Sequence, residues 1–113
     1  MTLPRDLVAA SSIPLVLSIL SQGQSYGYEI IQKVKTASEG EMLWADGMLY
    51  PILHRLEKRG QVQSSWGVAD SGRKRKYYRL SKAGQLELSE QRANWRKVNS
   101  LLDKFAASGD KHV

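Results

Sequence analysis

The 113-residue chain contains no cysteine, and this absence excludes several kinds of chemistry. Without thiols there is no disulfide, no cysteine nucleophile and no thiolate metal site. Histidine is scarce too, with two residues, one of them in the C-terminal tail. Because the chain also lacks an H-E-x-x-H motif and a glycine-rich phosphate loop, we expect no enzyme activity, no metal site and no cofactor.

Long apolar runs are missing as well. The most apolar N-terminal stretch, 13–20, is too short to cross a bilayer and is interrupted by Pro14 and Ser18. No small-residue cleavage site follows it, so it does not resemble a signal peptide. The sequence therefore predicts a cytoplasmic protein without a membrane partner.

Among the charged residues of the chain, positive ones are in excess. The formal net charge is +6, and five cationic residues fall within the segment 73–79. A basic protein favours an anionic partner, with nucleic acid first and an anionic membrane surface second. A hydrophobic content of 42% with 25% charged residues is ordinary for a folded chain of this length, which suits one domain with a modest core.

The predicted elements follow the order helix, helix, helix, strand, strand, helix. Apolar spacing and turn residues predict helices over 5–21, 26–38, 47–59 and 82–106, and strands over 61–67 and 73–80. Pro14 is expected to kink or restart the first helix, with Ser11 or Ser12 as the cap. The caps expected for the later helices are Ser25, Asp46 and Ser81, and Gly60 is expected to end the third helix.

This order is that of a winged helix-turn-helix with an added dimerisation helix, an α+β fold that is mostly helical. We expect a DNA-binding domain over 1–80, a dimerisation helix over 81–107 and a disordered tail over 108–113. The final helix would extend about 37 Å, beyond the body of so small a domain. Its apolar seam needs a partner, most commonly a second copy. The expected interface residues are Leu88, Trp95, Val98, Leu102 and Phe105.

Alternation along the two strands predicts which side chains are buried. Val62, Ser64 and Trp66 share one face of the first strand, and the second strand separates Tyr78 and Leu80 from Arg73, Arg75, Tyr77 and Arg79. The aromatic residues expected in the core are Tyr28, Tyr78 and Trp66. No role is assigned to Trp44.

The third helix and the basic hairpin together form a duplex-binding arrangement. The helix would enter the major groove, where His54 and Arg55 are the best candidates for contacts with base edges. Lys58, near the helix end, is expected to meet phosphate. The basic run would contact phosphates and so supply affinity and salt dependence rather than sequence choice. Taken alone, the same residues are also compatible with ordinary solvated polar surfaces.

Several short motifs occur in an order and at separations that resemble the PadR family of bacterial transcriptional regulators. They are Tyr26-Gly27-Tyr28-Glu29-Ile30, Leu49-Tyr50-Pro51-x-Leu53-x-Arg55-Leu56-Glu57, Trp66-Gly67, Gly72 to Leu80, and Gly84. The resemblance covers roughly residues 5–105 and places the chain with the short members, which resemble homodimeric repressors, often of detoxification or efflux genes. With it, the expected DNA-binding residues are Tyr26, Met48, Tyr50, Pro51, His54, Arg55, Lys58, Arg73, Lys74, Arg75 and Lys76.

The resemblance to the multidrug-binding short members also implies an effector site. There, Trp95 would flank a pore at the dimer interface and stack on a planar aromatic compound, although an aromatic residue on such a seam usually serves for packing. Asn99 stands where those proteins have an acidic residue, and Met48 where the family usually has Ser or Thr, whose hydroxyl can donate a hydrogen bond. The implied ligand-binding residues are Leu7, Ala10, Pro14, Leu17, Trp95, Val98 and Asn99.

The sequence thus predicts a ligand-responsive homodimeric repressor that binds a pseudo-palindromic duplex. Two alternatives stay open. One is a winged-helix dimer that serves as a protein-interaction module without specific operator binding. The other is a protein that binds anionic surfaces through its hairpin.

Overall fold

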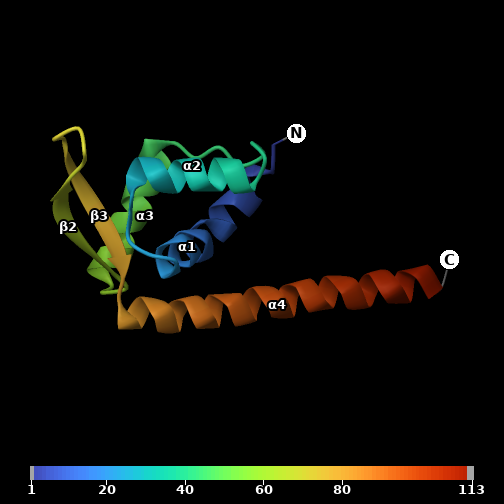
Figure 1. The fold of residues 1–113 in the computed structure, drawn as a ribbon. Helices are drawn as coiled ribbons and strands as arrows, with labels where there is room; N and C mark the ends of the chain where they lie inside the picture. The colour runs from blue at the N-terminus through green and yellow to red at the C-terminus, as the bar shows by residue number, and fades with distance from the viewer. Residues whose placement is uncertain (1, 112–113) are drawn as a thin grey trace.

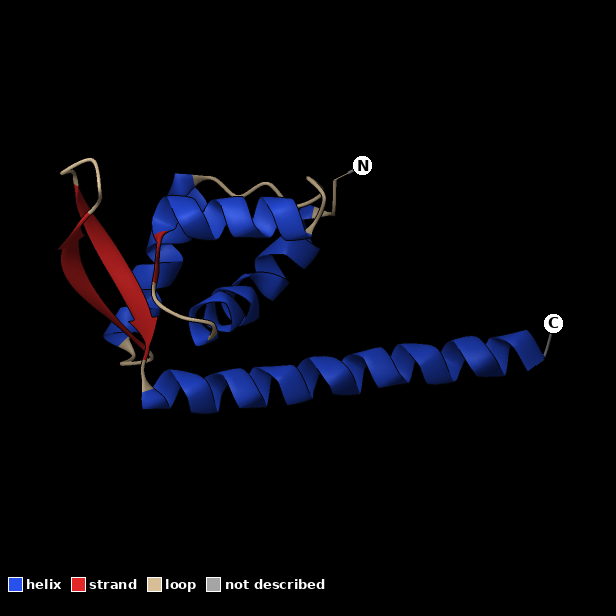
Figure 2. Ribbon diagram, viewed as in Figure 1, coloured by secondary structure: helices blue, strands red, loops and turns tan. Residues whose placement is uncertain are grey.

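The computed structural model describes the backbone of residues 2–111 and the side chains of residues 2–106 (Figure 1). A body of three helices and a small sheet carries one long projecting helix (Figure 2). This confirms the predicted winged helix-turn-helix, an α+β fold that is mostly helical. The elements are α1 (Arg5–Ser21), β1 (Ser25–Tyr26), α2 (Gly27–Ala37), α3 (Asp46–Lys58), β2 (Val62–Val68), β3 (Lys74–Leu80) and α4 (Lys82–Lys111).

The sheet has three antiparallel strands in the order β1-β3-β2, where the sequence predicted a two-stranded hairpin. Ser25 and Tyr26 pair with Tyr78 and Tyr77 of β3. Ser25 is therefore a strand residue and not the predicted helix cap. Its hydroxyl donates a hydrogen bond to Glu29 Oε1 over 2.5 Å. Through this pairing, the segment that begins the helix-turn-helix is joined to the wing, which we define as β2, β3 and the turn between them.

One hydrophobic core lies where α1, α2 and α3 meet the base of the sheet. The predicted apolar stripe of α3 is confirmed, because its residues at three- and four-residue spacing are all buried. Tyr78 is buried as predicted, and Trp44, which had no assigned role, is 5% exposed. The core consists of Val16, Leu17, Leu20, Ile30, Val34, Met42, Trp44, Leu49, Ile52, Leu53, Leu56, Val62, Tyr78 and Leu88.

Two of the three aromatic residues predicted for the core lie at the surface instead. Trp66 is 70% exposed and Tyr28 is 65% exposed. Strand alternation did place Trp66 on the same face as Val62, which is 1% exposed. However, the wing extends past the helices, so only the part of this face nearest the body is covered. Alternation identifies the face of a strand but not how far the core reaches along it.

The first helix passes through Pro14 without a break, so the expected restart does not occur. Ser11 and Ser12 do not cap a new helix. Their hydroxyls donate hydrogen bonds to the carbonyl oxygens of Leu7 and Ala9, at 2.7 and 2.8 Å, within α1 itself. Such hydroxyl-to-carbonyl bonds are compatible with a continuing helix.

The third helix begins one residue earlier than predicted. Ala45 occupies the cap position and Asp46 is the first helical residue, so Asp46 is not the cap. Pro51 consequently lies in the second turn. The end of the helix agrees with the prediction, because Gly60 has φ +74°, a left-handed conformation that glycine adopts without a steric cost.

The start of α4 is anchored to the loop that follows α3. The Gly84 amide donates a hydrogen bond to Ser81 Oγ over 3.1 Å, which confirms Ser81 as the cap. The Ser81 hydroxyl in turn donates to the Gly60 carbonyl oxygen over 2.5 Å. The helix then continues to Lys111, so residues 108–111 of the expected disordered tail are helical. Residues 112–113 of that tail lie outside the described residues.

The predicted dimer seam divides into two parts. Leu88 is 4% exposed and packs in the core of its own chain, so we remove it from the expected interface. Beyond it, α4 leaves the body (Figure 1), and Val98, Leu102 and Phe105 are 49%, 65% and 74% exposed. In the part of the chain that the structure describes, no helix is both long and apolar enough to cross a membrane.

Candidate nucleic-acid interface

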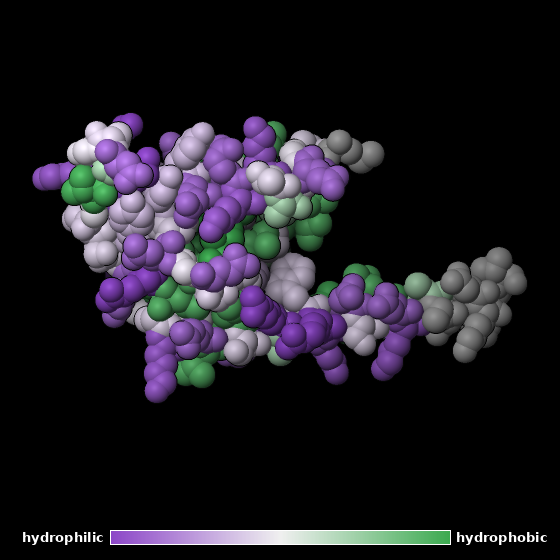
Figure 3. Space-filling view, viewed as in Figure 1, coloured by the Kyte–Doolittle hydropathy of each residue, from purple (hydrophilic) through white to green (hydrophobic). Residues whose placement is uncertain are grey.

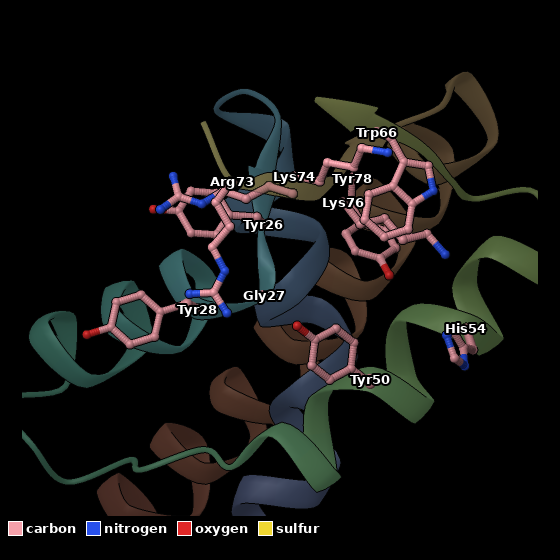
Figure 4. Close-up of a pocket in the computed structure, with 11 residues that line it drawn as sticks. Tyr26, Gly27, Tyr28, Tyr50, His54, Trp66, Arg73, Lys74, Lys76 and Tyr78 are labelled. Atoms are coloured by element: carbon pink, nitrogen blue, oxygen red, sulfur yellow. The ribbon is translucent and has the colours of Figure 1, made fainter. Parts of the chain in front are cut away.

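A groove of about 690 Å³ lies between the start of α2, the side of α3 and the wing (Figure 4). It brings together aromatic rings and cations from segments that are far apart in the sequence. Seven of the eleven predicted DNA-binding residues line it. The lining residues are Tyr26, Gly27, Tyr28, Tyr50, His54, Trp66, Arg73, Lys74, Arg75, Lys76 and Tyr78.

The remaining predicted DNA-binding residues lie outside this groove. Met48, Pro51 and Arg55 line a second hollow of about 830 Å³ between α3 and the start of α1. Lys58 is exposed at the C-terminal end of α3. Neighbouring residues of a helix differ by about 100° around its axis, so His54 and Arg55 point to adjacent flanks of the solvent-facing side of α3. The predicted set therefore forms a surface that wraps around α3 rather than a single pocket.

The basic run of the wing is divided between two faces. Lys74 and Lys76 lie directly opposite Val68 and Trp66 of β2, on the face that carries Tyr78 nearer the body. Arg75 lies on the other face, because successive side chains in a strand point to opposite sides. The wing therefore presents cations in two directions.

Arg75 is held by an aromatic platform. Its guanidinium carbon lies 4.2 Å from the centroid of the Tyr26 ring. The Tyr26 ring in turn contacts Tyr77 edge-on, with centroids 5.6 Å apart and an interplanar angle of 78°. Because β1 pairs with β3, Tyr26 sits opposite Tyr77 in the register. The structure thus adds a positioning role for Tyr26, which no sequence pattern revealed because the β1 pairing is non-local.

The start of α2 and the Tyr50 side chain of α3 approach each other closely at Gly27. A Cβ added there would lie 2.6 Å from the Tyr50 hydroxyl oxygen, closer than two such atoms can approach. Tyr50 is 39% exposed, so part of its ring packs against α2 while the rest faces the groove. The absence of a side chain at Gly27 therefore leaves room for the Tyr50 ring against the start of α2.

Beneath the groove lies a small polar cluster. The Glu57 carboxylate accepts a hydrogen bond from the Ser64 hydroxyl. The Tyr78 hydroxyl is buried and has no hydrogen-bond partner among the described residues. Burial raises the pKa of the Tyr78 phenol above its ordinary value of 10.0, and the nearby Glu57 carboxylate raises it further, with a smaller electrostatic contribution from Tyr50. Tyr78 therefore supplies a neutral hydroxyl at physiological pH and not a charge.

The residues of the implied effector site lie elsewhere, on α1 and α4. Leu7 is 42% exposed and Ala10 is exposed, but Leu17 is fully buried in the core and has no surface with which to line a pore. Trp95 is half-buried, and Val98 and Asn99 are exposed. Among the side chains of residues 2–106, no cluster of three metal-binding groups is found.

Comparison with known proteins identifies the family of the chain. The sequence profile of the transcriptional regulator PadR-like family matches residues 16–90, from the middle of α1 to the first turns of α4. The chain belongs to the PadR family. An uncharacterized protein from Lysinibacillus sphaericus is 30% identical to it over 100 residues, which cover 88% of this chain and 92% of that protein.

Solved structures of bacterial transcriptional regulators match most of the chain. A transcriptional regulator from Clostridium thermocellum has a TM-score of 0.83 at 27% identity, covering 92% of this chain and 98% of that one. A PadR-like transcriptional regulator from Bacillus cereus has a TM-score of 0.78 at 27% identity, with coverages of 88% and 95%. As a PadR-family protein, the chain is a transcription regulator and not an enzyme.

Proposed function

We propose that this PadR-family regulator binds a pseudo-palindromic DNA operator as a homodimer, represses transcription, and releases the operator when a planar aromatic effector binds. The observation that carries the proposal is the groove between α3 and the wing. It combines the exposed flank of a helix-turn-helix recognition element with four consecutive cationic residues, Arg73 to Lys76. A cationic groove beside such a helix is complementary to a duplex.

The two flanks of α3 would read the major groove. The helix buries Leu49, Leu53 and Leu56 against the core and exposes His54 and Arg55 on the opposite side. An arginine pairs through two hydrogen bonds with the O6 and N7 atoms of guanine, which gives Arg55 the strongest potential for sequence choice. Pro51 and the methyl group of Met48 offer apolar surface on the same flank.

The wing would grip the backbone beside the groove that α3 reads. Arg73, Lys74, Arg75 and Lys76 supply the charges, and Tyr26 holds the Arg75 guanidinium in place. Each neutralised phosphate contributes about −0.9 to the slope of log affinity against log salt concentration. This term gives affinity on every sequence and so cannot by itself select an operator.

The projecting half of α4 would form the dimer interface. Val98, Leu102 and Phe105 expose apolar area that the described residues of their own chain leave open to solvent. A two-fold axis along this seam would place two copies of α3 symmetrically, and that symmetry is what a pseudo-palindromic operator matches.

The same interface would hold the effector. Trp95 and Val98 on α4, together with Leu7, Ala10 and Pro14 on α1, provide apolar and aromatic area, and Asn99 provides a neutral amide. An effector changes DNA affinity only if it binds one dimer geometry better than the other. If Trp95 stacks on the effector, Trp95→Ala will remain dimeric but lose the quenching of fluorescence by planar aromatic compounds. Unchanged ligand affinity in that variant would remove the stacking role.

The proposed function is tested by titrating the protein into two duplexes of equal length at several salt concentrations. One duplex carries the region upstream of the protein's own gene and the other a scrambled sequence of the same composition. We expect tighter binding to the upstream duplex and a linear loss of affinity with log salt. Equal affinity for both duplexes would exclude specific operator binding, and affinity independent of salt would exclude phosphate contacts by the wing.

A further inference from the structure

Trp66 is the largest apolar side chain that the wing exposes. It is 70% exposed, although it lies on the same strand face as the buried Val62. An indole exposed to water does not contribute the hydrophobic stabilisation that its burial would give, and a tryptophan can bury about 150–250 Å². The wing contains a second such residue, Val68, which is 68% exposed. Figure 3 shows hydrophobic surface on the wing surrounded by hydrophilic side chains.

Each of these apolar side chains is paired across the strands with a lysine. Trp66 lies opposite Lys76, and Val68 lies opposite Lys74. The Lys76 ammonium lies 5.7 Å from the centroid of the Tyr78 ring, which holds it beside the groove. One face of the wing therefore carries two apolar side chains next to two positive charges. A duplex groove has the same pairing, with sugars and base edges inside and phosphates at the rims.

The position of Trp66 directs it toward the DNA-facing side of the molecule. It lines the groove together with Tyr50 and His54 of α3, and Figure 4 shows its ring near Tyr78 on the α3 side of the wing. A separate, smaller hollow of about 390 Å³, lined by Trp66, Gly67, Val68 and Lys74, lies along the wing. The indole thus forms a ridge that borders two hollows. A duplex that contacts the His54 flank of α3 would lie close enough to contact the indole.

We infer that Trp66 is a non-electrostatic DNA contact, whose indole packs against the sugars and base edges of the minor groove next to the segment that α3 reads. Lys74 and Lys76 contact the phosphates on either side. The wing then contributes two separable parts to affinity: a salt-dependent part from its cations and a salt-independent part from the burial of Trp66. This inference rests on the proposed function and names a contact within that site.

The two parts are separated by measuring affinity against salt for single variants, on a duplex that the wild-type protein selects from a random pool. We expect Trp66→Ala to bind about tenfold more weakly at every salt concentration, with an unchanged slope, so that its line runs parallel to that of the wild type. Lys76→Ala should lower the magnitude of the slope by about 0.9. Trp66→Phe, which keeps an aromatic ring, should recover most of the affinity.

Leu86→Ala is the matched control, because Leu86 is also 70% exposed but lies on α4, outside the groove. It should bind DNA as the wild type does. Trp66 contributes little to the core, so circular dichroism and the melting temperature should change little in Trp66→Ala. An affinity within twofold of the wild type, or a reduced slope, would overturn the inference.

Fluorescence provides an independent measurement. DNA should change the tryptophan emission of the wild type, and this change should be clearly smaller in Trp66→Phe while binding persists. An emission change of equal size in the two proteins contradicts the inference. The failures of the two proposals are distinguishable. A wild-type protein with neither sequence preference nor salt-dependent binding would fail the proposed function and the inference together. Unaltered binding by Trp66→Ala would fail the inference alone.

Discussion

The hydroxyl oxygen of Tyr50 lies 2.6 Å from the place where a Cβ on Gly27 would stand. Gly27 is the first residue of α2 and Tyr50 lies in α3, so this pair is a close contact between the two helices of the helix-turn-helix. The same Tyr50 ring forms part of the groove wall. The packing of the helix pair and the shape of the proposed DNA-binding surface are therefore coupled through one contact.

Gly27→Ala should destabilise the protein by about 1–3 kcal/mol, because the added methyl group overpacks the contact with Tyr50. Urea denaturation measures the free energy of unfolding. Tyr50→Ala removes the clashing ring, so the double variant should be more stable than the sum of the two single effects predicts. Strict additivity would show that the cost at position 27 has another origin.

Tyr26→Leu should weaken DNA binding by about two- to fivefold, because the loss of the ring releases the Arg75 guanidinium and an exposed cation–π contact is worth about 0.5–1 kcal/mol. Fluorescence anisotropy with a labelled duplex measures the change. Tyr26→Phe keeps the ring and should bind as the wild type does. In an Arg75→Ala background, Tyr26→Leu should have no further effect, and an additional loss there would mean that Tyr26 contacts DNA itself.

Arg55→Ala should reduce the difference in affinity between operator and scrambled duplex by about 1–3 kcal/mol if the guanidinium pairs with guanine. Lys58→Ala serves as the comparison, since a phosphate contact should weaken binding on both duplexes alike and lower the magnitude of the salt slope by about 0.9. Competition binding measures the affinity for each duplex, and repeating it at several salt concentrations gives the slope. Uniform weakening by Arg55→Ala would make Arg55 a backbone contact.

Leu102→Asp should shift the protein from dimer to monomer, because it places a charge in the proposed apolar interface of α4. Sedimentation velocity reads the change, while circular dichroism should still report a folded body. Leu88→Ala should behave differently. Truncating this buried side chain leaves a cavity, which should lower the free energy of unfolding by about 2–5 kcal/mol. A Leu102→Asp variant that stays dimeric would place the interface elsewhere.

Tyr78→Phe should be neutral or stabilising at neutral pH, because it removes a buried hydroxyl with no partner among the described residues. The pKa of Tyr78 is raised above 10.0 in the folded protein, so the unfolded chain loses this proton first as pH rises. The free energy of unfolding of the wild type should therefore fall above about pH 10. Denaturation between pH 8 and about pH 11 should show a smaller fall in Tyr78→Phe. An equal fall in both proteins would assign the effect to other groups.

The sequence by itself determined the features that depend on neighbouring residues. The apolar stripe of α3, the left-handed Gly60 after it and the Ser81 cap of α4 were all predictable, because each follows from helix periodicity or from the geometry of a few consecutive residues. The order of the elements and the basic segment at 73–76 then sufficed to indicate a winged helix-turn-helix. The local start signals were less reliable: Ser25 and Asp46 have cap chemistry, but neither serves as the cap.

Only the tertiary structure decided where these elements meet. Ser25 and Tyr26 form a strand because β3, some fifty residues away, supplies their hydrogen-bond partners. Leu17 and Leu88 are core residues of one chain, whereas Trp66, on the same strand face as Val62, extends beyond the core into solvent. Side-chain periodicity gives the direction in which a residue points, but its burial depends on whether other segments of the chain pack against that face. For the same reason, the groove between α3 and the wing emerged only from the folded chain.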